Sequence, residues 1–151
     1  MRHFELHPSG LLEKTGGGAT SQLKILFKSS SAGMLAARSG ILGFTHALVS
    51  NGRMRGNSIF LFPNGQSLAG TVAPDSWLTF LNDVTITDTL DIDIAGGVPD
   101  RPAINGNLTL AASAALRLSP VPEPLPAVTP LPQVKADNHY GTFGQMAAPC
   151  S

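Results

Sequence analysis

A chain of 151 residues, 42% of them hydrophobic, has the length of a single domain and can bury roughly 68–70% of its unfolded surface. Only 13% of its residues are charged and the net charge is zero, whereas soluble globular proteins average about 25% charged residues. The sequence has no apolar run of about 18 residues and no dense basic segment, which excludes a membrane-spanning helix and argues against binding to nucleic acid. No signal peptide is evident, so we expect a protein of the cytoplasm or of a virion assembled there.

The charges are unevenly distributed along the chain. Residues 1–55 carry seven Lys or Arg against two Glu, and residues 56–151 carry three Lys or Arg against eight Asp or Glu. This distribution allows copies of the chain to associate head to tail, or the two halves to neutralise each other within one fold. The second interpretation is the simpler one. The single cysteine, Cys150, excludes an internal disulfide, and its role is open.

Residues 1–20 are predicted to form an extended N-terminal arm. They contain a turn-forming Pro8-Ser9-Gly10 and a triple glycine at 16–18, which favours a flexible joint. The β domain is expected to begin at residue 21, because apolar residues take alternate positions in 22–28, as in a strand with one buried face.

The best helix candidate of the chain is 34–38, although one or two turns alone are marginally stable. Asn51-Gly52 is a favourable turn for a β-hairpin, and Arg53-Met54-Arg55 is interpreted as a basic loop tip. Further strands are predicted over residues 43–50, 58–62 and 68–72, and residues 77–81 form a strand or a capped helical turn.

The strongest β pattern lies in residues 84–118, and the domain is expected to be organised around it. From Val84 to Ile94 apolar residues occupy the even positions and Thr or Asp the odd ones, with Asp88 as the only break. A similar alternation returns between Ile104 and Leu118. Such a period places one set of side chains on a buried face. We therefore predict two long strands that pair antiparallel, with one side solvated.

These elements predict a single all-β domain, a β-sandwich or jelly roll or else a small barrel. No internal repeat at a fixed period is evident in the sequence. The predicted organisation is an N-terminal arm over residues 1–20, the β domain over residues 21–118 and a Pro-rich extended arm over residues 119–151.

The C-terminal arm is predicted from its prolines, which remove backbone N–H groups and fix φ. The segment is therefore expected to be extended and to stay out of the central sheets. A segment that is already extended loses little conformational entropy on docking, so we predict that it binds a neighbouring subunit instead of its own core. The predicted partner-binding residues are Pro122, Pro124, Leu125, Pro126, Leu131, Tyr140 and Phe143.

No catalytic motif stands out. The four histidines are scattered, no serine lies in an activating motif and Cys150 has no fixed base, so we expect neither an enzyme nor a bound cofactor. Ca²⁺ takes oxygen ligands, but the spacing of the densest oxygen cluster is not that of a calcium loop, and we expect no metal site there. That cluster consists of Asp88, Asp91, Asp93 and Asp100 with Asn105 and Asn107.

An all-β core with extended arms, few charges and no catalytic set indicates a structural assembly protein. We predict a virion component, such as a phage capsid decoration (cement) or coat-type subunit. Its arms would bind copies of itself or a major structural protein, without contact to nucleic acid or membrane. The alternative is a small β-sandwich module that binds carbohydrate or a protein partner. Trp77, Phe80 and Leu81 are candidates for a sugar platform, although core packing explains them more simply.

Overall fold

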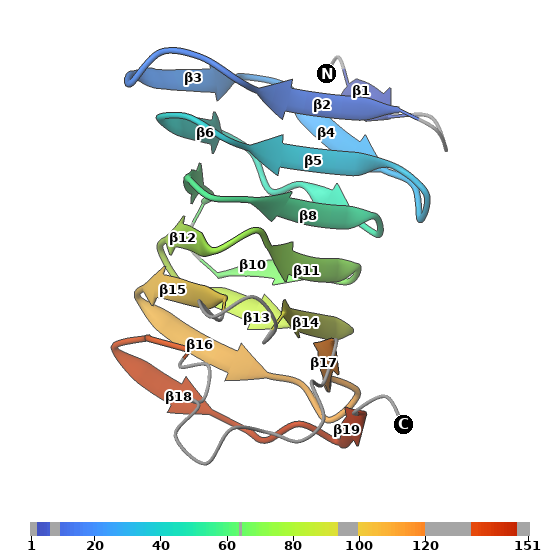
Figure 1. The fold of residues 1–151 in the computed structure, drawn as a ribbon. Coiled ribbons are helices and arrows are strands. Elements are labelled where there is room, and N and C mark those ends of the chain that lie inside the picture. Colours follow the sequence, from blue (N-terminus) through green and yellow to red (C-terminus); the bar gives the residue numbers. More distant parts are fainter. Residues whose placement is uncertain (1–2, 7–9, 64, 94–99, 120–133, 148–151) are drawn as a thin grey trace.

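The computed structural model describes residues 3–6, 10–63, 65–93, 100–119 and 134–147, and every regular element in these ranges is a β-strand. All neighbouring strands pair in parallel. Strands that follow one another in sequence lie in different sheets, and most pair with the strand one turn later, although the first sheet ends at β7 and β10 begins another. The chain therefore winds into a β-solenoid, with its first strands at the top of the stack and its last at the bottom (Figure 1).

The solenoid has three sides, called faces 1, 2 and 3, and each turn of the chain is called a rung. Face 1 consists of two sheets in line: β1 (His3–Leu6), β4 (Leu26–Ser29) and β7 (Val49–Ser50), then β10 (Gln66–Leu68), β13 (Val84–Ile86), β16 (Asn107–Leu110) and β18 (Asn138–Tyr140). Face 2 consists of β2 (Leu11–Lys14), β5 (Met34–Ala37), β8 (Arg53–Gly56), β11 (Thr71–Pro74), β14 (Thr89–Asp93), β17 (Ala115–Ser119) and β19 (Gln145–Ala147). Face 3 consists of β3 (Thr20–Leu23), β6 (Ile41–Phe44), β9 (Ile59–Leu61), β12 (Trp77–Leu81) and β15 (Arg101–Asn105).

The register repeats after each turn of the chain. On face 2, Met54 pairs with Val72 and Val72 pairs with Leu90, so these two successive turns have the same length. Other turns are longer, as the pairing of Leu12 with Leu35 and of Leu90 with Leu116 shows. The repeat therefore exists in space, and its variable length conceals it from a search for a fixed period in the sequence.

The inward side chains stack into ladders along the solenoid axis. On face 3, Leu42, Phe60, Phe80 and Ile104 occupy the same position on successive rungs, and each is at most 4% exposed. The rings of Phe60 and Phe80 stack with centroids 5.8 Å apart, and Phe62 lies 5.7 Å from both. Burial of one such side chain contributes about 1.5–3 kcal/mol, so the ladder is a main source of stability.

The all-β prediction is confirmed, but the strands form a solenoid instead of a sandwich, jelly roll or barrel. β13 and β14 belong to different faces, and the chain turns a corner at Asp88, the residue that breaks the alternation. β13 pairs with β16 and β14 with β17, in both cases parallel, so the predicted antiparallel pair is wrong. Alternation shows that one side of a strand is buried, and it holds for parallel and antiparallel neighbours alike.

Two local predictions are also corrected. The predicted helix at 34–38 is strand β5, whose backbone pairs with β2 on one side and β8 on the other. The sheet thereby satisfies the hydrogen bonds that a helix would have made. Asn51-Gly52 is not a hairpin turn, because it connects β7 to β8 at the corner between faces 1 and 2.

That corner is closely stacked. A Cβ built on Gly70 would lie 1.9 Å from the carbonyl oxygen of Gly52, and one built on Gly52 would lie 2.1 Å from that of Gly33. Hydrogen bonds run along the same corner, from Arg53 N to Gly33 O (2.9 Å) and from Thr71 N to Gly52 O (3.1 Å). Only glycine fits where one backbone approaches the next so closely.

Segments of both predicted arms form strands of the solenoid. β1 and β2 lie within the N-terminal range 1–20, and β18 and β19 lie within the C-terminal range 119–151, where they extend faces 1 and 2. Val134, Ala136 and Phe143 pack partly buried against the core of their own chain. These described segments therefore contribute to the fold.

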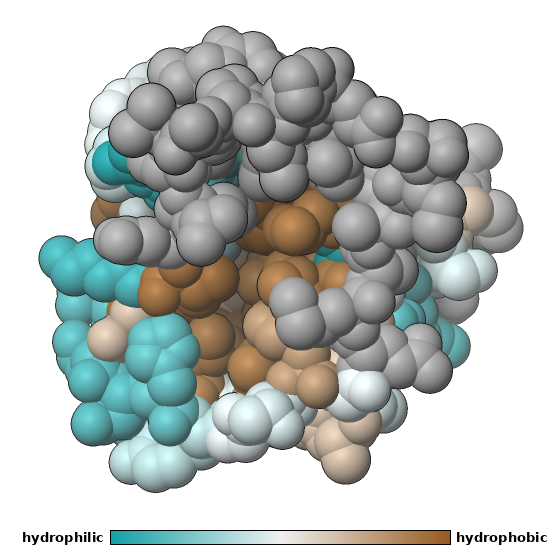
Figure 2. Space-filling view, turned by 60° about the horizontal axis from the view of Figure 1, so that its bottom comes forward, coloured by the Kyte–Doolittle hydropathy of each residue, from teal (hydrophilic) through white to brown (hydrophobic). Residues whose placement is uncertain are grey.

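Hydrophobic residues also lie at the lower end of the solenoid. Figure 2 brings this end forward and shows apolar residues gathered at the middle of the molecule, with hydrophilic residues along one side. Leu110, Leu116 and Leu118, on β16 and β17, are among the partly buried residues that pack against the core. Among the described residues, the partly buried hydrophobic side chains that pack against the core thus lie in the first and last rungs and not in the middle ones.

Candidate functional site

Outward side chains of face 2 form a charged hollow of about 220 Å³, called the face 2 groove. The parallel register creates it, because Arg55 on β8 pairs with Ala73 on β11, and β14 follows as the next strand. The groove lies where these strands run toward the corner between faces 2 and 3. Its lining residues are Arg53, Arg55, Ala73, Pro74, Asp75, Asp91, Asp93 and Asp100.

Two ion pairs organise the groove. Arg55 Nε lies 3.1 and 3.0 Å from the two carboxylate oxygens of Asp75, and this hydrogen bonding raises the pKa of Arg55. Arg53 Nη2 lies 3.7 Å from Asp91 Oδ2. Each pair joins the basic N-terminal part of the chain to the acidic C-terminal part, so opposite charges of the two halves meet on face 2.

Arg38 extends this network toward the first rung. Its Nε donates to Glu13 Oε1, and its Nη1 lies 3.4 Å from Asp75 Oδ2. Asp75 therefore accepts hydrogen bonds from two arginines, Arg55 on β8 and Arg38 directly after β5. Such charge-assisted bonds hold the carboxylate in a fixed position.

Asp100 is the buried acid of the groove, with 5% of the residue exposed. Its Oδ2 accepts a hydrogen bond from Asp93 N at 2.8 Å, and its own N–H donates to Asp93 O at 2.9 Å. Burial raises the pKa of Asp100 to about 6, and the nearby carboxylates of Asp93, Asp75 and Asp91 act in the same direction. The side chain therefore changes near this pH from a hydrogen-bond donor to an acceptor.

An exposed aromatic residue lies just around the corner from the groove. Trp77 begins β12 on face 3, two residues after Asp75, and is 56% exposed. Arg101 pairs with it in register and lies over the ring, with the guanidinium carbon 5.4 Å from the ring centroid. This cation–π contact orients the indole, while more than half of the residue stays open to solvent. Phe80, in contrast, is 1% exposed and belongs to the core.

The structure separates the oxygen-bearing residues that the sequence groups together. Within the described ranges, no set of three or more His, Cys, Asp or Glu residues is arranged to hold a metal ion. Three of the six residues, Asp91, Asp93 and Asp100, line the groove, whereas Asp88, Asn105 and Asn107 lie at other corners of the solenoid.

Arg53 and Arg55 lie on strand β8 instead of at the loop tip that the sequence predicts. Asp75 joins them, although no motif marks it. Asp75 could be identified from the length of the turn. Val72 pairs with Leu90, and Asp93 follows Asp75 by the same number of residues, so the two aspartates take equivalent positions on neighbouring rungs. If the number of residues in each turn is not known, residues so distant in sequence cannot be assigned to one site.

The predicted partner-binding residues differ in what the structure shows. Tyr140 lies on β18 and is 54% exposed, whereas Phe143 packs partly buried against the core of its own chain. Partner binding by this set stays a prediction. Pro122, Pro124, Leu125, Pro126 and Leu131 lie outside the described residues, as does Cys150.

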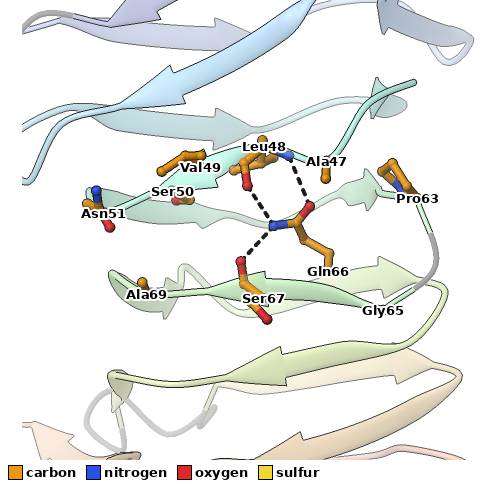
Figure 3. Close-up of a pocket in the computed structure, with 10 residues that line it drawn as sticks. All are labelled: Ala47, Leu48, Val49, Ser50, Asn51, Pro63, Gly65, Gln66, Ser67 and Ala69. Carbon is orange, nitrogen blue, oxygen red and sulfur yellow. Dashed lines mark hydrogen bonds between the residues drawn. The ribbon is translucent and has the colours of Figure 1, made fainter.

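A second hollow of about 360 Å³ lies on face 1, where the sheet is interrupted between β7 and β10 (Figure 3). Gln66 points its side-chain amide across this gap toward the backbone of Leu48 (Figure 3). Oε1 accepts from Leu48 N at 3.0 Å, and Nε2 donates to Leu48 O at 2.8 Å and to Ser67 O at 2.6 Å. The amide is thus used inside the fold, and we assign this hollow a structural origin.

Comparison with family models, with curated proteins and with solved structures gives no match for this chain. In the part of the chain that the structure describes, no helix has the length and apolar character needed to cross a bilayer. The function of the groove and of the solenoid ends is therefore inferred from the residues that form them.

Proposed function

We propose that this chain is a structural assembly protein, such as a virion subunit, whose solenoid joins a neighbouring subunit end to end. One observation carries the proposal: in the described residues, no strand pairs with the outer edge of β1, β2 or β3, which end their sheets. An unpaired edge presents backbone N–H and C=O groups that a strand of another chain can satisfy.

The hydrogen bonds between β3 and the next rung indicate which backbone groups of β3 point to the open edge. The carbonyl oxygens of Ala19 and Leu23 accept hydrogen bonds of 3.4 and 3.1 Å from the next rung. Backbone groups of successive residues point to opposite sides of a strand, so those of Thr20 and Gln22 point to the open edge. Both residues are exposed.

The same end of the solenoid is hollow. A cavity of about 370 Å³ is lined by Leu12, Leu23 and Leu42 together with polar residues of β2 and β3. Leu42 is 4% exposed and belongs to the core, so the cavity reaches the ladder of face 3. An adjoining rung would fill it with apolar side chains, as neighbouring rungs do within a solenoid.

The composition of this edge also favours association. Charged residues on an edge strand protect it against pairing. β3 carries none, whereas β2 carries Glu13 and Lys14, so β3 is the part of the edge that is open to pairing. Leu11, at the start of β2, is 54% exposed. The charged fraction of only 13% over the whole chain is consistent with a subunit that is enclosed by neighbours, since charged residues are depleted from the centres of interfaces.

Substitutions at the open edge test the proposal. Gln22→Pro removes the outward N–H at a position where proline is tolerated, whereas Gln22→Ala keeps it. In sedimentation velocity over a concentration series, we expect the full wild-type chain and Gln22→Ala to associate and Gln22→Pro to remain monomeric. Leu11→Lys, which adds a charge without changing the backbone, should act like Gln22→Pro. A wild-type chain that stays monomeric, or edge variants that associate equally well, would contradict the proposal.

A further inference from the structure

The face 2 groove carries polar groups that end-to-end association does not use. We propose that it binds a neutral carbohydrate chain. The hydroxyl groups of the sugar are held by the arginines and aspartates of the groove, and an adjoining ring lies against Trp77.

The mixed charge of the lining selects the class of ligand. Arg53 and Arg55 supply N–H donors, and the groove has four carboxylates in addition. These carboxylates would repel an anionic ligand, and the two guanidinium groups at the same place would repel a cationic one. A hydroxyl group both donates and accepts hydrogen bonds, so a neutral ring with adjacent hydroxyls satisfies both sets without adding charge.

The polar groups are already positioned. Arg55 is held by both oxygens of Asp75, Arg53 lies against Asp91, and the carboxyl of Asp100 is tied to the Asp93 backbone. Side chains fixed in this way lose little conformational entropy when a ligand binds. The groove therefore requires little rearrangement to accept a polar ligand.

Apolar surface lies beside these groups. Ala73 and Pro74 contribute to the lining but are both buried, so the accessible apolar surface is the indole of Trp77, two residues after Asp75. Two residues of extended chain span at most about 7 Å, so the backbone of Trp77 lies within the length of a ligand of more than one ring that is bound in the groove. Aromatic faces pack well against the C–H faces of sugars, which combine apolar area with a polar rim.

Asp100 gives the site a dependence on pH. It faces other titratable and charged groups, namely Arg53 and Arg55 from β8, Asp75 directly after β11, and Asp91 and Asp93 from β14. Protonation of Asp100 changes one acceptor of the groove into a donor while the arginines keep their charge. Affinity should therefore differ between about pH 5 and about pH 7.5 in the wild type, and the difference should disappear in Asp100→Asn.

Calorimetric titration of the full chain tests the inference. The probes are cellohexaose, xylohexaose and mannohexaose as neutral oligomers, with hexagalacturonate as the anionic and chitosan hexamer as the cationic comparison. We expect at least one neutral oligomer to bind, and both charged oligomers to bind at least about tenfold more weakly, a difference of about 1.4 kcal/mol.

Matched variants then locate the site. Trp77→Ala and Arg53→Ala should weaken binding at least about tenfold. The controls Tyr140→Ala and Lys24→Ala remove an aromatic residue and a cation that are also exposed but lie away from the groove, and they should leave affinity unchanged. Tyr140 is a close match because it is 54% exposed, against 56% for Trp77. All four side chains are at the surface, and equal melting temperatures would show that the fold is kept.

Three results would overturn the inference: no binding of any neutral oligomer, tighter binding of a charged one, or equal affinity of the groove variants and their controls. None of these results bears on the open edge of β3, whose association is measured separately by sedimentation.

Discussion

Gln66 and Leu48 lie on adjacent rungs of face 1. The side chain of Gln66 makes the hydrogen bonds to the Leu48 backbone that a paired strand would otherwise make. The side-chain amide of Gln66 accepts a hydrogen bond from Leu48 N at 3.0 Å and donates one to the carbonyl oxygen of Leu48 at 2.8 Å. Both residues are almost fully buried, at 4% and 3% exposed. A primary amide carries the same donor and acceptor as a peptide group, so it joins the two sheets of face 1 across their interruption.

Removal of this bridge should destabilise the protein. Gln66→Ala leaves a buried N–H and a buried C=O without their partner, and we expect the free energy of unfolding to fall by about 2–4 kcal/mol. Urea denaturation followed by circular dichroism measures the loss. Gln22→Ala, at an exposed position of β3, is the control and should change stability by less than about 0.5 kcal/mol. Equal stability of the two variants would show that the bridge contributes nothing.

The stacked corner between faces 1 and 2 makes a second prediction. In Gly70→Ala the new methyl group would lie 1.9 Å from the oxygen of Gly52, so the rungs must separate locally, at a cost of about 1–3 kcal/mol. In Gly18→Ala the new methyl group meets nothing within 4 Å, and stability should stay near that of the wild type. Thermal melts of both variants make the comparison, and a Gly70→Ala chain as stable as Gly18→Ala would rule out the close stacking.

Asp100 should make stability depend on pH. Its pKa is about 6 in the folded state and about 4 in an unfolded chain. The folded state therefore holds the proton more tightly, and the stabilisation from this group is complete below about pH 4 and lost as the pH rises through 6. Asp100→Asn keeps an acceptor for Asp93 N but cannot ionise.

We therefore expect Asp100→Asn to gain stability relative to the wild type between about pH 4 and pH 7, by up to roughly 3 kcal/mol for a shift of about two pKa units. Denaturation at several pH values measures this difference. Asp88→Asn, at an exposed corner, is the control. A constant difference between wild type and Asp100→Asn over this range would disprove the raised pKa.

The two sides of β14 should differ strongly in how much stability a substitution removes. Ile92 is 1% exposed, and Ile92→Asp places an unpaired charge in the core at a cost of several kcal/mol, enough to unfold a marginally stable domain. Asp91→Asn removes only the ion pair with Arg53 and should cost about 0–1 kcal/mol. Similar melting temperatures of the two variants would mean that the inward and outward sides of β14 are wrongly assigned.

The alternation in residues 84–94 shows what could be predicted from sequence. It correctly places Leu90 and Ile92 on the buried side, where they are 0% and 1% exposed, because side-chain direction depends only on the strand itself. The choice of partner strand depends on the turn length, which is shorter from Val72 to Leu90 than from Leu90 to Leu116. Parallel and antiparallel neighbours leave the same local pattern, so the solenoid was not predictable from alternation alone.

The groove illustrates the same limit. Arg55 and Asp75 form a two-oxygen ion pair although they are far apart in sequence, and no local motif links them. Asp91, Asp93 and Asp100 are grouped correctly by their closeness in sequence, but their arginine partners come from earlier rungs. A site built across rungs becomes visible only when the length of each turn is known.

The register of face 2 also implies that the molecule is divisible into modules. Thr71 and Thr89 are paired on neighbouring strands, so deletion of residues 71–88 removes one whole turn and brings β14 onto β8 in the position that β11 held. In a stack where each turn touches only its neighbours, stability is roughly a sum over turns and their contacts. The shortened chain should therefore fold with a lower melting temperature and an unchanged type of circular dichroism spectrum. Deletion of the half turn 71–79 would shift every later strand to the wrong face, and that chain should not fold.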